Sequence, residues 1–272
     1  MKSNLAQRAL TAIVAVSILI PAIVWSGLGV WLLATVVSLL GIWEFWGIHE
    51  VKEPRYRWLA LVPAALVWAF VAVETWDLLP LPPEGLLMVS LLTLPLILLR
   101  QLFDPKADHP AARTGTLVLG YIYVLIPMYL LFRLSYMDGT GIYNFQIPLG
   151  ILFLTWVLDV MAYFAGRFLG KHPLFPRISP KKTWEGAIGA TVFCFLTAWL
   201  FQSWWQPDGY NWFIIAGIIS VTSQLGDLVE SMFKRQASIK DSGSILPGHG
   251  GMLDRFDGMF ISLPFIFSYF LM

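Results

Sequence analysis

The side chains that could do chemistry gather most densely in one stretch, Ser231 to Asp257, whose sequence is SMFKRQASIKDSGSILPGHGGMLDRFD. Carboxylate oxygens suit a hard divalent cation, cations neutralise phosphates, and glycine turns let backbone N–H groups approach phosphate oxygens. A segment this polar beside long apolar runs must lie in water or line a watered cavity. Its charged and titratable side chains are Lys234, Arg235, Lys240, Asp241, His249, Asp254, Arg255 and Asp257.

Two further acids, Asp227 and Glu230, lie just before this stretch. The spacing from Gln224 to Asp227 to Glu230 places the three side chains on one helical face. Two carboxylates on one face at a membrane boundary repel each other unless a cation lies between them, and Mg²⁺ typically pairs few carboxylates with substrate phosphates. A metal site is one interpretation, and pairing of Glu230 with Lys234 or Arg235 is the other.

Asp159 lies inside an apolar run that ends in Arg167 and Lys171. An ionisable group within a membrane span costs about 2.5–3.5 kcal/mol on insertion scales and needs a partner or a cavity. Asp159 is therefore predicted to be a site residue, with a structural ion pair to Arg167 or to a snorkelling lysine as the alternative.

The segment Ser179 to Gly186, SPKKTWEG, opens another apolar run. Serine at an N-cap followed by proline at the first helical position predicts a helix start at Ser179. Free backbone N–H groups there, together with Lys181 and Lys182, would form a phosphate-binding corner. Ordinary basic residues flanking a membrane span are the competing interpretation.

The elements that must position these groups are membrane helices. The 272-residue chain is 57% apolar and only 13% charged, whereas a soluble domain carries roughly a quarter charged residues. Apolar runs of about 17–25 residues cross the hydrocarbon core as helices, and about nine such runs are present. The sequence therefore predicts an all-α, polytopic integral membrane protein. The predicted spans are Ala9–Trp25, Leu28–Ile48, Trp58–Trp76, Gly85–Phe103, Thr116–Leu134, Ile147–Phe164, Gly186–Trp204, Trp212–Met232 and Phe256–Leu271.

The predicted organisation is a single membrane domain over residues 1–272. The half up to residue 134 consists of apolar spans with short loops, whereas polar groups enter the spans in the half from 135 to 272, which contains the 231–257 stretch. The first apolar run follows a basic N-terminus but has no small-x-small cleavage site, so we expect it to be a retained span.

The distribution of Lys and Arg predicts the orientation. With the N-terminus in the cytoplasm, every Lys and Arg except Arg133 falls on the cytoplasmic side of the predicted spans. The formal net charge of +1 indicates no global basic field for nucleic acid. A single cysteine, Cys194, excludes an intramolecular disulfide and a multi-cysteine metal site.

These features place carboxylates for a metal, cations for phosphates and open glycine turns together at one membrane surface. No Ser-His-Asp or Cys-His arrangement and no His-rich metal set is evident in the sequence. The combination indicates phosphoryl or nucleotidyl transfer onto a lipid by metal-assisted direct displacement.

The stretch Ser231–Asp257 resembles the signature of the phosphatidate cytidylyltransferases (CDP-diacylglycerol synthases), S-x-hydrophobic-K-R-x4-K-D-x-small-x2-aliphatic-P-x-H-G-G-hydrophobic-x-D-R-hydrophobic-D, and meets every specified position. Asp159, Gly166-Arg167, Ser179–Thr183 and Gln224-x-Gly226-Asp227 also resemble the family's pattern. The resemblance covers residues 159–257, and the first half agrees only in being a set of membrane helices.

The resemblance implies that CTP and phosphatidic acid yield CDP-diacylglycerol and pyrophosphate in the cytoplasmic leaflet of the cell (inner) membrane. It also implies a homodimer, and Mg²⁺ held by Asp227 and Asp254 with or without a second cation such as K⁺. The residues implied for catalysis are Asp159, Asp227, Lys240, Asp241 and Asp254. The residues implied for substrate binding are Ser179, Lys181, Lys182, Lys234, Arg235, His249, Gly250, Gly251 and Arg255.

Three other functions fit parts of the same pattern. A CTP-dependent lipid kinase is one, and a phospho-alcohol transferase is another, although its paired-aspartate motif of the DGxxAR…GxxxD…D kind is not found. The non-enzyme alternative is a transporter in which Asp159 and Asp227 carry ions. A transporter predicts polar sites at the bilayer midplane and internal repeats, whereas these acids gather toward one membrane face.

Overall fold

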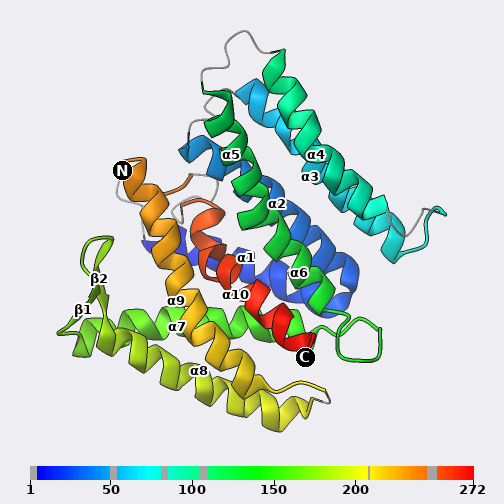
Figure 1. Cartoon of the computed structure of the whole chain (residues 1–272). Helices are drawn as coiled ribbons and strands as arrows, with labels where there is room; N and C mark the ends of the chain where they lie inside the picture. Colours follow the sequence, from blue (N-terminus) through cyan, green and yellow to red (C-terminus); the bar gives the residue numbers. More distant parts are fainter. Residues whose placement is uncertain (1–4, 50–53, 81–84, 104–108, 208, 244–249) are drawn as a thin grey trace.

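The computed structural model describes residues 5–49, 54–80, 85–103, 109–207, 209–243 and 250–272, which are mostly helical (Figure 1). A short antiparallel hairpin of two strands adds a small non-helical element to the predicted all-α architecture. The elements are α1 (Leu5–Trp25), α2 (Gly27–Ile48), α3 (Pro54–Thr75), α4 (Gly85–Leu102), α5 (Pro110–Gly120), the π-helical turn η1 (Tyr121–Leu125), α6 (Ile126–Leu134), α7 (Gln146–Leu169), β1 (Pro173–Phe175), β2 (Ser179–Thr183), α8 (Trp184–Trp205), α9 (Trp212–Gln236) and α10 (Leu253–Phe270).

Each predicted span coincides, within a few residues, with one of these helices or with the segment α5–η1–α6, which is continuous from 110 to 134. In the part of the chain that the structure describes, six helices are long and apolar enough to cross a membrane. Shorter apolar stretches occupy 16–25 in α1 and 88–102 in α4. The protein is therefore a polytopic membrane protein, and the count of nine spans stays a prediction.

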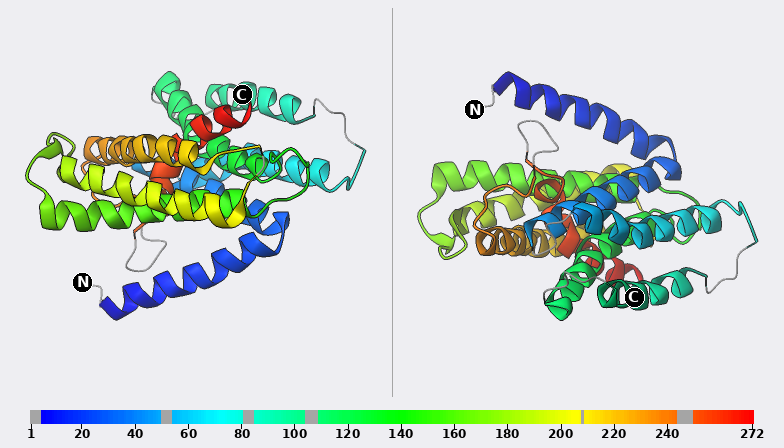
Figure 2. Two further views of the ribbon diagram at one scale, coloured as in Figure 1. Left: turned by 90° about the horizontal axis from the view of Figure 1, so that it is seen from below. Right: turned by 90° about the horizontal axis from the view of Figure 1, so that it is seen from above.

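The helices of the second half form one packed group. α7 packs against α8, α8 against α9, and α9 against α10, and α10 in turn contacts α6 and α2. Figure 1 shows α3 and α4 as a pair set off from this group, and Figure 2 shows α1 extending away from it. The two halves of the chain thus meet mainly through α2, α6 and α10.

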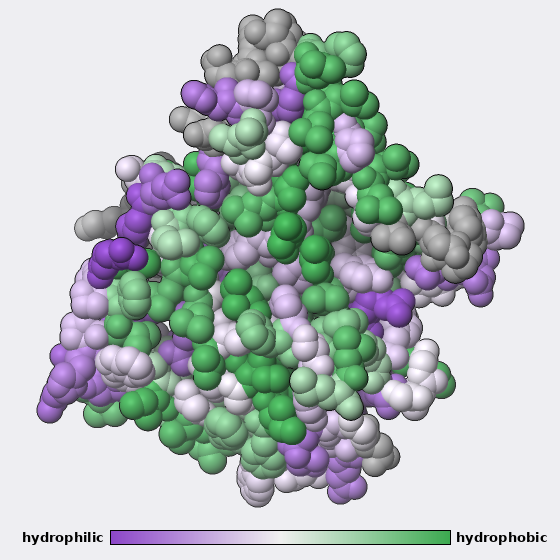
Figure 3. Space-filling view, viewed as in Figure 1, coloured by the Kyte–Doolittle hydropathy of each residue, from purple (hydrophilic) through white to green (hydrophobic). Residues whose placement is uncertain are grey.

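Large aromatic side chains fill the interior, among them the fully buried Trp46, Trp68 and Trp212. Apolar side chains also cover much of the outer surface in Figure 3, and Leu91, Ile188 and Val221 are each more than 60% exposed. An exterior this apolar suits hydrocarbon rather than water.

Loop contacts identify the two ends of the helix bundle. At one end the Tyr143 hydroxyl donates to the Ile23 carbonyl at the end of α1, and the Asn211 N–H donates to the Tyr269 hydroxyl at 2.9 Å. At the opposite end, the C-terminal ends of α7 and α9 meet the starts of α8 and α10 around one cavity. These four helix ends share a side, as the predicted topology requires.

Candidate active site

A polar cavity of about 470 Å³ lies where α7, β2, α8, α9 and α10 meet. Four carboxylates line it, from Asp159, Asp227, Asp254 and Asp257. Three cations also line it, from Arg167, Lys181 and Lys182. The cavity therefore combines acids that could hold a metal with cations that could hold phosphates.

Asp227 reaches the cavity from the C-terminal half of α9. Its Oδ2 atom is 2.5 Å from Lys182 Nζ, and the Ser231 hydroxyl one turn later donates to its Oδ1 at 3.3 Å. Since Lys182 comes from β2, this ion pair joins the hairpin to α9. The carboxylate is half-buried and faces the space where a ligand would sit.

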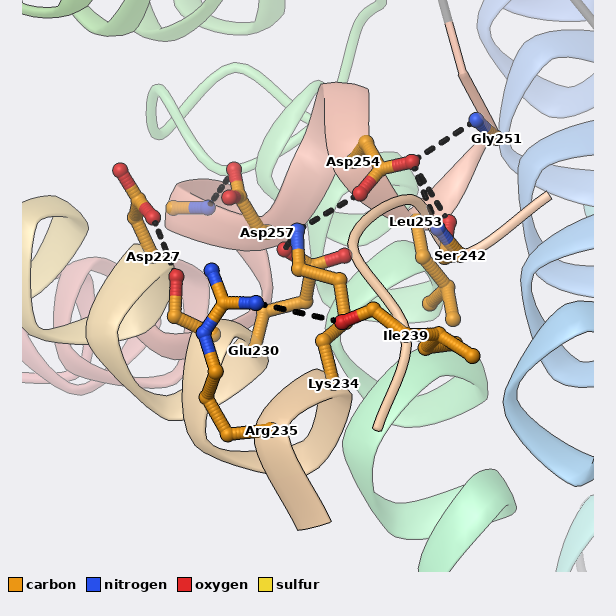
Figure 4. A network of polar contacts seen from close by, with 12 residues as sticks. Asp227, Glu230, Lys234, Arg235, Ile239, Ser242, Gly251, Leu253, Asp254 and Asp257 are labelled. Atoms are coloured by element: carbon orange, nitrogen blue, oxygen red, sulfur yellow. Dashed lines mark hydrogen bonds and ion pairs between the residues drawn. The ribbon is translucent and has the colours of Figure 1, made fainter. Parts of the chain in front are cut away.

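Asp254 is held more tightly than Asp227, in the first turn of α10. Lys234 Nζ lies 2.7 Å from its Oδ1, and its Oδ2 accepts from Gly251 N at 2.8 Å and from both the backbone N and the Oγ of Ser242 at 2.9 Å (Figure 4). Acids near a helix N-terminus are stabilised by the helix dipole. A Cβ at Gly250, whose φ is +81°, would come 2.7 Å from Asp254 Oδ2. The glycine pair therefore lets the loop close onto this carboxylate.

Lys234 joins two acids, because its ammonium group contacts Glu230 one turn earlier on α9 as well as Asp254. Glu230 is only 1% exposed, and Figure 4 shows it behind the lysine. Of the two interpretations from the sequence, pairing of Glu230 with Lys234 is confirmed. Glu230 therefore does not line the cavity, and it contributes to the site through its contact with Lys234.

Asp159 lies on the cavity wall formed by α7. Among the described residues it forms no ion pair, and Arg167 instead donates to the Tyr163 hydroxyl at 2.8 Å. The alternative of a structural ion pair between Asp159 and Arg167 is therefore wrong. A group that is costly to place in a membrane span thus lies beside a polar cavity that Lys182 also lines.

The prediction that a helix starts at Ser179 is also wrong. Residues 179–183 form strand β2, which pairs with β1 in a register that places Phe175 opposite Ser179 and Pro173 opposite Thr183. A proline is tolerated in such a two-stranded ribbon, because an edge strand need not donate every N–H. Helix α8 begins at Trp184, and its N-cap is Thr183, whose hydroxyl accepts from Gly186 N at 3.2 Å.

The hairpin nevertheless brings Lys181 and Lys182 to the cavity, as the sequence predicted, although from a strand instead of a helix N-terminus. The half-buried Ser179 lies outside the cavity lining.

Several predicted site residues lie apart from the cavity lining. Arg235 donates to the carbonyls of Ile178 and Ile239, at 3.5 and 3.3 Å. Lys240, Asp241 and Arg255 are exposed. Gly250 and Gly251 form the turn beside Asp254, and His249 lies outside the described residues.

A divalent metal fits the donors at this cavity. Its acidic residues offer hard carboxylate oxygens, which suit Mg²⁺, and carboxylates that face one space repel each other unless cations are present. In the part of the chain that the structure describes, no group of three His, Cys, Asp or Glu side chains is arranged to hold a metal ion. Mg²⁺ commonly takes only one or two carboxylates and completes its shell with substrate phosphates and water.

The structure adds two acids to the predicted set. Asp257 lines the cavity from α10; in the sequence it lies with Asp254 at the start of the last predicted span, but it is not among the residues implied for catalysis or metal binding. Glu44 of α2 is 5% exposed and accepts from Leu253 N at 2.9 Å. An acid inside the apolar run 28–48 is the same signal that singled out Asp159, so the sequence did contain a sign of Glu44.

The chain is similar to known proteins over nearly its whole length. A model of the cytidylyltransferase family matches residues 6–272. A phosphatidate cytidylyltransferase of Haemophilus influenzae is 32% identical, with 98% of both chains covered. Those of Bacillus subtilis and Brucella abortus are 32% and 33% identical, covering 97% and 98% of this chain and 97% and 93% of their own.

Proposed function

Since the chain belongs to the cytidylyltransferase family, we propose that it transfers CMP from CTP to phosphatidate, giving CDP-diacylglycerol and pyrophosphate. The protein is then a nucleotidyltransferase of phospholipid biosynthesis. One structural observation carries the assignment to a site: four residues from three separate elements line a single cavity at one end of the helix bundle, namely Asp227 of α9, Asp254 of α10, and Lys181 and Lys182 of β2.

Asp227 and Asp254 are the carboxylates that would hold Mg²⁺, with or without a second cation such as K⁺. Both face the cavity, and each is paired with a lysine, Asp227 with Lys182 and Asp254 with Lys234. Lys182 and Lys234 balance the charge of the two carboxylates. The hairpin lysines, Lys181 and Lys182, also line the cavity and can bind the phosphates of a substrate there. Mg²⁺, when bound, supplies positive charge against the triphosphate and the lipid phosphate.

The reaction is a direct in-line displacement. An oxygen of the phosphatidate phosphate forms a bond to the α-phosphorus of CTP as the bond from that phosphorus to the β-phosphate oxygen breaks, and pyrophosphate leaves. The attacking phosphate is already anionic, so a strong general base is not required. Lys181 and Lys182 neutralise the triphosphate and the departing pyrophosphate, which is the electrostatic contribution that phosphoryl-type transfers need most.

The placement in the membrane follows the charge distribution of the sequence. We assign nine spans with the N-terminus in the cytoplasm, which places the cavity at the cytoplasmic face of the cell (inner) membrane. The lipid substrate then arrives from the bilayer and CTP from the cytoplasm. A homodimer is the assembly that the family resemblance favours.

The experiment that tests the activity is conversion of radiolabelled CTP to a lipid-soluble product by the detergent-solubilised protein. Label in the organic phase is expected only when phosphatidic acid and Mg²⁺ are both present. Release of labelled cytidine nucleotide without a lipid product would indicate hydrolysis, and no lipid-soluble cytidine under any condition would overturn the proposed activity.

A further inference from the structure

Glu44 is an acid from the first half of the chain that is buried against the signature stretch of the second half. It lies near the end of α2, is 5% exposed, and its Oε2 accepts from Leu253 N at 2.9 Å. The Ser242 hydroxyl lies 3.4 Å from the same oxygen. Burying a carboxylate in a membrane protein is costly unless hydrogen bonds stabilise it.

Its first partner is the start of α10. The N-cap residue of this helix, Met252, makes no side-chain cap. The first N–H groups of a helix have no partner within the helix and need an acceptor. Glu44 supplies that acceptor at Leu253, the residue immediately before Asp254. A carboxylate at a helix N-terminus is also favoured by the helix dipole.

Its second partner, Ser242, connects it to Asp254. The Ser242 Oγ lies 2.9 Å from Asp254 Oδ2, and the Ser242 N–H donates to the same carboxylate oxygen at 2.9 Å. The hydroxyl thus stands between the carboxylates of Glu44 and Asp254. Glu44 therefore holds the helix turn that carries Asp254 through Leu253, and it lies against the Ser242 hydroxyl that donates to Asp254.

Two glycines make room for Glu44. The three nearest atoms to a Cβ at Gly243 would all belong to Glu44, including Cδ at 2.8 Å and Cγ at 3.2 Å. A Cβ at Gly251 would lie 2.2 Å from Ser242 Oγ and 2.5 Å from Glu44 Oε2. Neither glycine has a positive φ. The space that Glu44 occupies at Gly243, and that Glu44 and Ser242 occupy at Gly251, therefore requires glycine at these positions, and the backbone conformation does not.

From these contacts we propose that Glu44 is a positioning residue for the cytidylyl transfer, because it fixes the direction in which Asp254 presents its carboxylate to the cavity. The proposal rests on the proposed metal-binding role of Asp254. Partners that orient a metal-binding carboxylate typically change metal affinity or activity by about 10–100-fold when they are removed.

The first test measures metal binding directly on substrate-free protein, with Mn²⁺ as an EPR-visible substitute for Mg²⁺. Glu44→Ala is expected to weaken Mn²⁺ binding by about 10–100-fold. Glu44→Gln keeps one acceptor oxygen and should bind Mn²⁺ more tightly than Glu44→Ala. The control is Ser38→Ala, because Ser38 is also buried on α2 but donates only within its helix, to the Ala34 carbonyl at 2.6 Å. Unchanged Mn²⁺ binding in folded Glu44→Ala would overturn the proposal.

The second test uses the contact with Gly243. Gly243→Ala alone should displace Glu44 and weaken both Mn²⁺ binding and turnover, whereas in the Glu44→Ala background the same substitution should add no further loss. Residues in contact give such non-additive effects, and independent residues give additive ones. Additive losses would overturn the proposal, even if Glu44→Ala itself folds poorly.

A third variant distinguishes failure of the positioning role of Glu44 from failure of the metal-binding role of Asp254. Asp254→Asn should abolish the Mn²⁺ signal if Asp254 holds the metal. If Mn²⁺ still binds to Asp254→Asn, the metal assignment is wrong and the positioning role falls with it, whereas a lost signal in Asp254→Asn with unchanged binding in Glu44→Ala would overturn the positioning role alone.

Discussion

Gly226 of α9 lies against Gly258 of α10, so that a Cβ at Gly226 would come 3.0 Å from the Gly258 Cα and 2.6 Å from the carbonyl oxygen of Asp257. Small residues at helix crossings let membrane helices approach closely. Asp227 and Asp257 are the sequence neighbours of these glycines, and both line the cavity. The close crossing therefore determines how far apart the carboxylates of the two helices stand.

Gly226→Ala is expected to lower both the melting temperature and the turnover, because the added Cβ forces α9 and α10 apart. Overpacking of this kind costs about 1–3 kcal/mol. The matched control is Gly217→Ala on the same helix, where the nearest atom to a new Cβ is Phe195 Cζ at 3.7 Å, an ordinary contact. Thermal unfolding in detergent and CTP turnover measure the two effects. Equal behaviour of the two variants would show that the crossing does not depend on Gly226.

Asp227→Asn and Asp254→Asn should each lose more than about 100-fold in Mg²⁺-dependent turnover while the protein still elutes as a folded species. A metal that has lost a carboxylate contributes several kcal/mol less to the transition state, and each 1.36 kcal/mol is tenfold in rate. Arg133→Ala, at the opposite end of the predicted spans, should leave the turnover nearly unchanged. Activity near that of the unsubstituted protein in either Asp variant would remove the metal assignment, and a severe loss in Arg133→Ala would contradict the topology.

Lys182→Met is expected to raise the KM for CTP by about 10–100-fold, because hydrogen bonds to charged groups contribute roughly 1.5–3 kcal/mol. Its ammonium group lines the cavity and pairs with Asp227. Lys171→Met is the control, since this exposed lysine lies outside the cavity lining and, among the residues that the structure describes, only its backbone N–H makes a hydrogen bond, to Glu185. Steady-state kinetics with varied CTP separates KM from kcat. An equal rise in the KM for CTP in both variants would indicate that the loss of any nearby positive charge has this effect, wherever the lysine lies.

Lys234→Met should destabilise the protein by about 3–5 kcal/mol, because it leaves the buried Glu230 as an unpaired charge. Adding Glu230→Gln removes that charge and should recover part of the lost thermal stability, so the two substitutions are expected to be non-additive. Melting temperatures of the two single variants and the double variant test this. If the losses in melting temperature of the two single variants add up to that of the double variant, the Glu230–Lys234 contact does not stabilise the fold.

The helices could be predicted from the sequence because their signals are local. A membrane span needs a run of apolar residues of sufficient length, and each such run coincides with a helix within a few residues. The hairpin was missed because its signal is not local: Ser179 and Pro180 read as a helix start, but pairing with residues 173–175 makes them a strand. The true cap, Thr183, stands four residues later.

The candidate site was predictable in part for the same reason. Lys181, Lys182, Asp159, Asp227 and Asp254 are polar groups beside or within apolar runs, and all five line the cavity. The exposed positions of Lys240 and Asp241 depend on the path of a loop, which side-chain chemistry alone does not dictate.

By itself the sequence determined the class of the protein, a polytopic membrane enzyme, and the residue types of its site, because hydrophobic length and the cost of charges in lipid act on each segment separately. Only the tertiary structure decided that Lys234 joins Glu230 to Asp254 and that Glu44 reaches the start of α10. Those contacts depend on how closely helices cross. In a membrane, that closeness comes from small residues and side-chain packing between segments far apart in the chain.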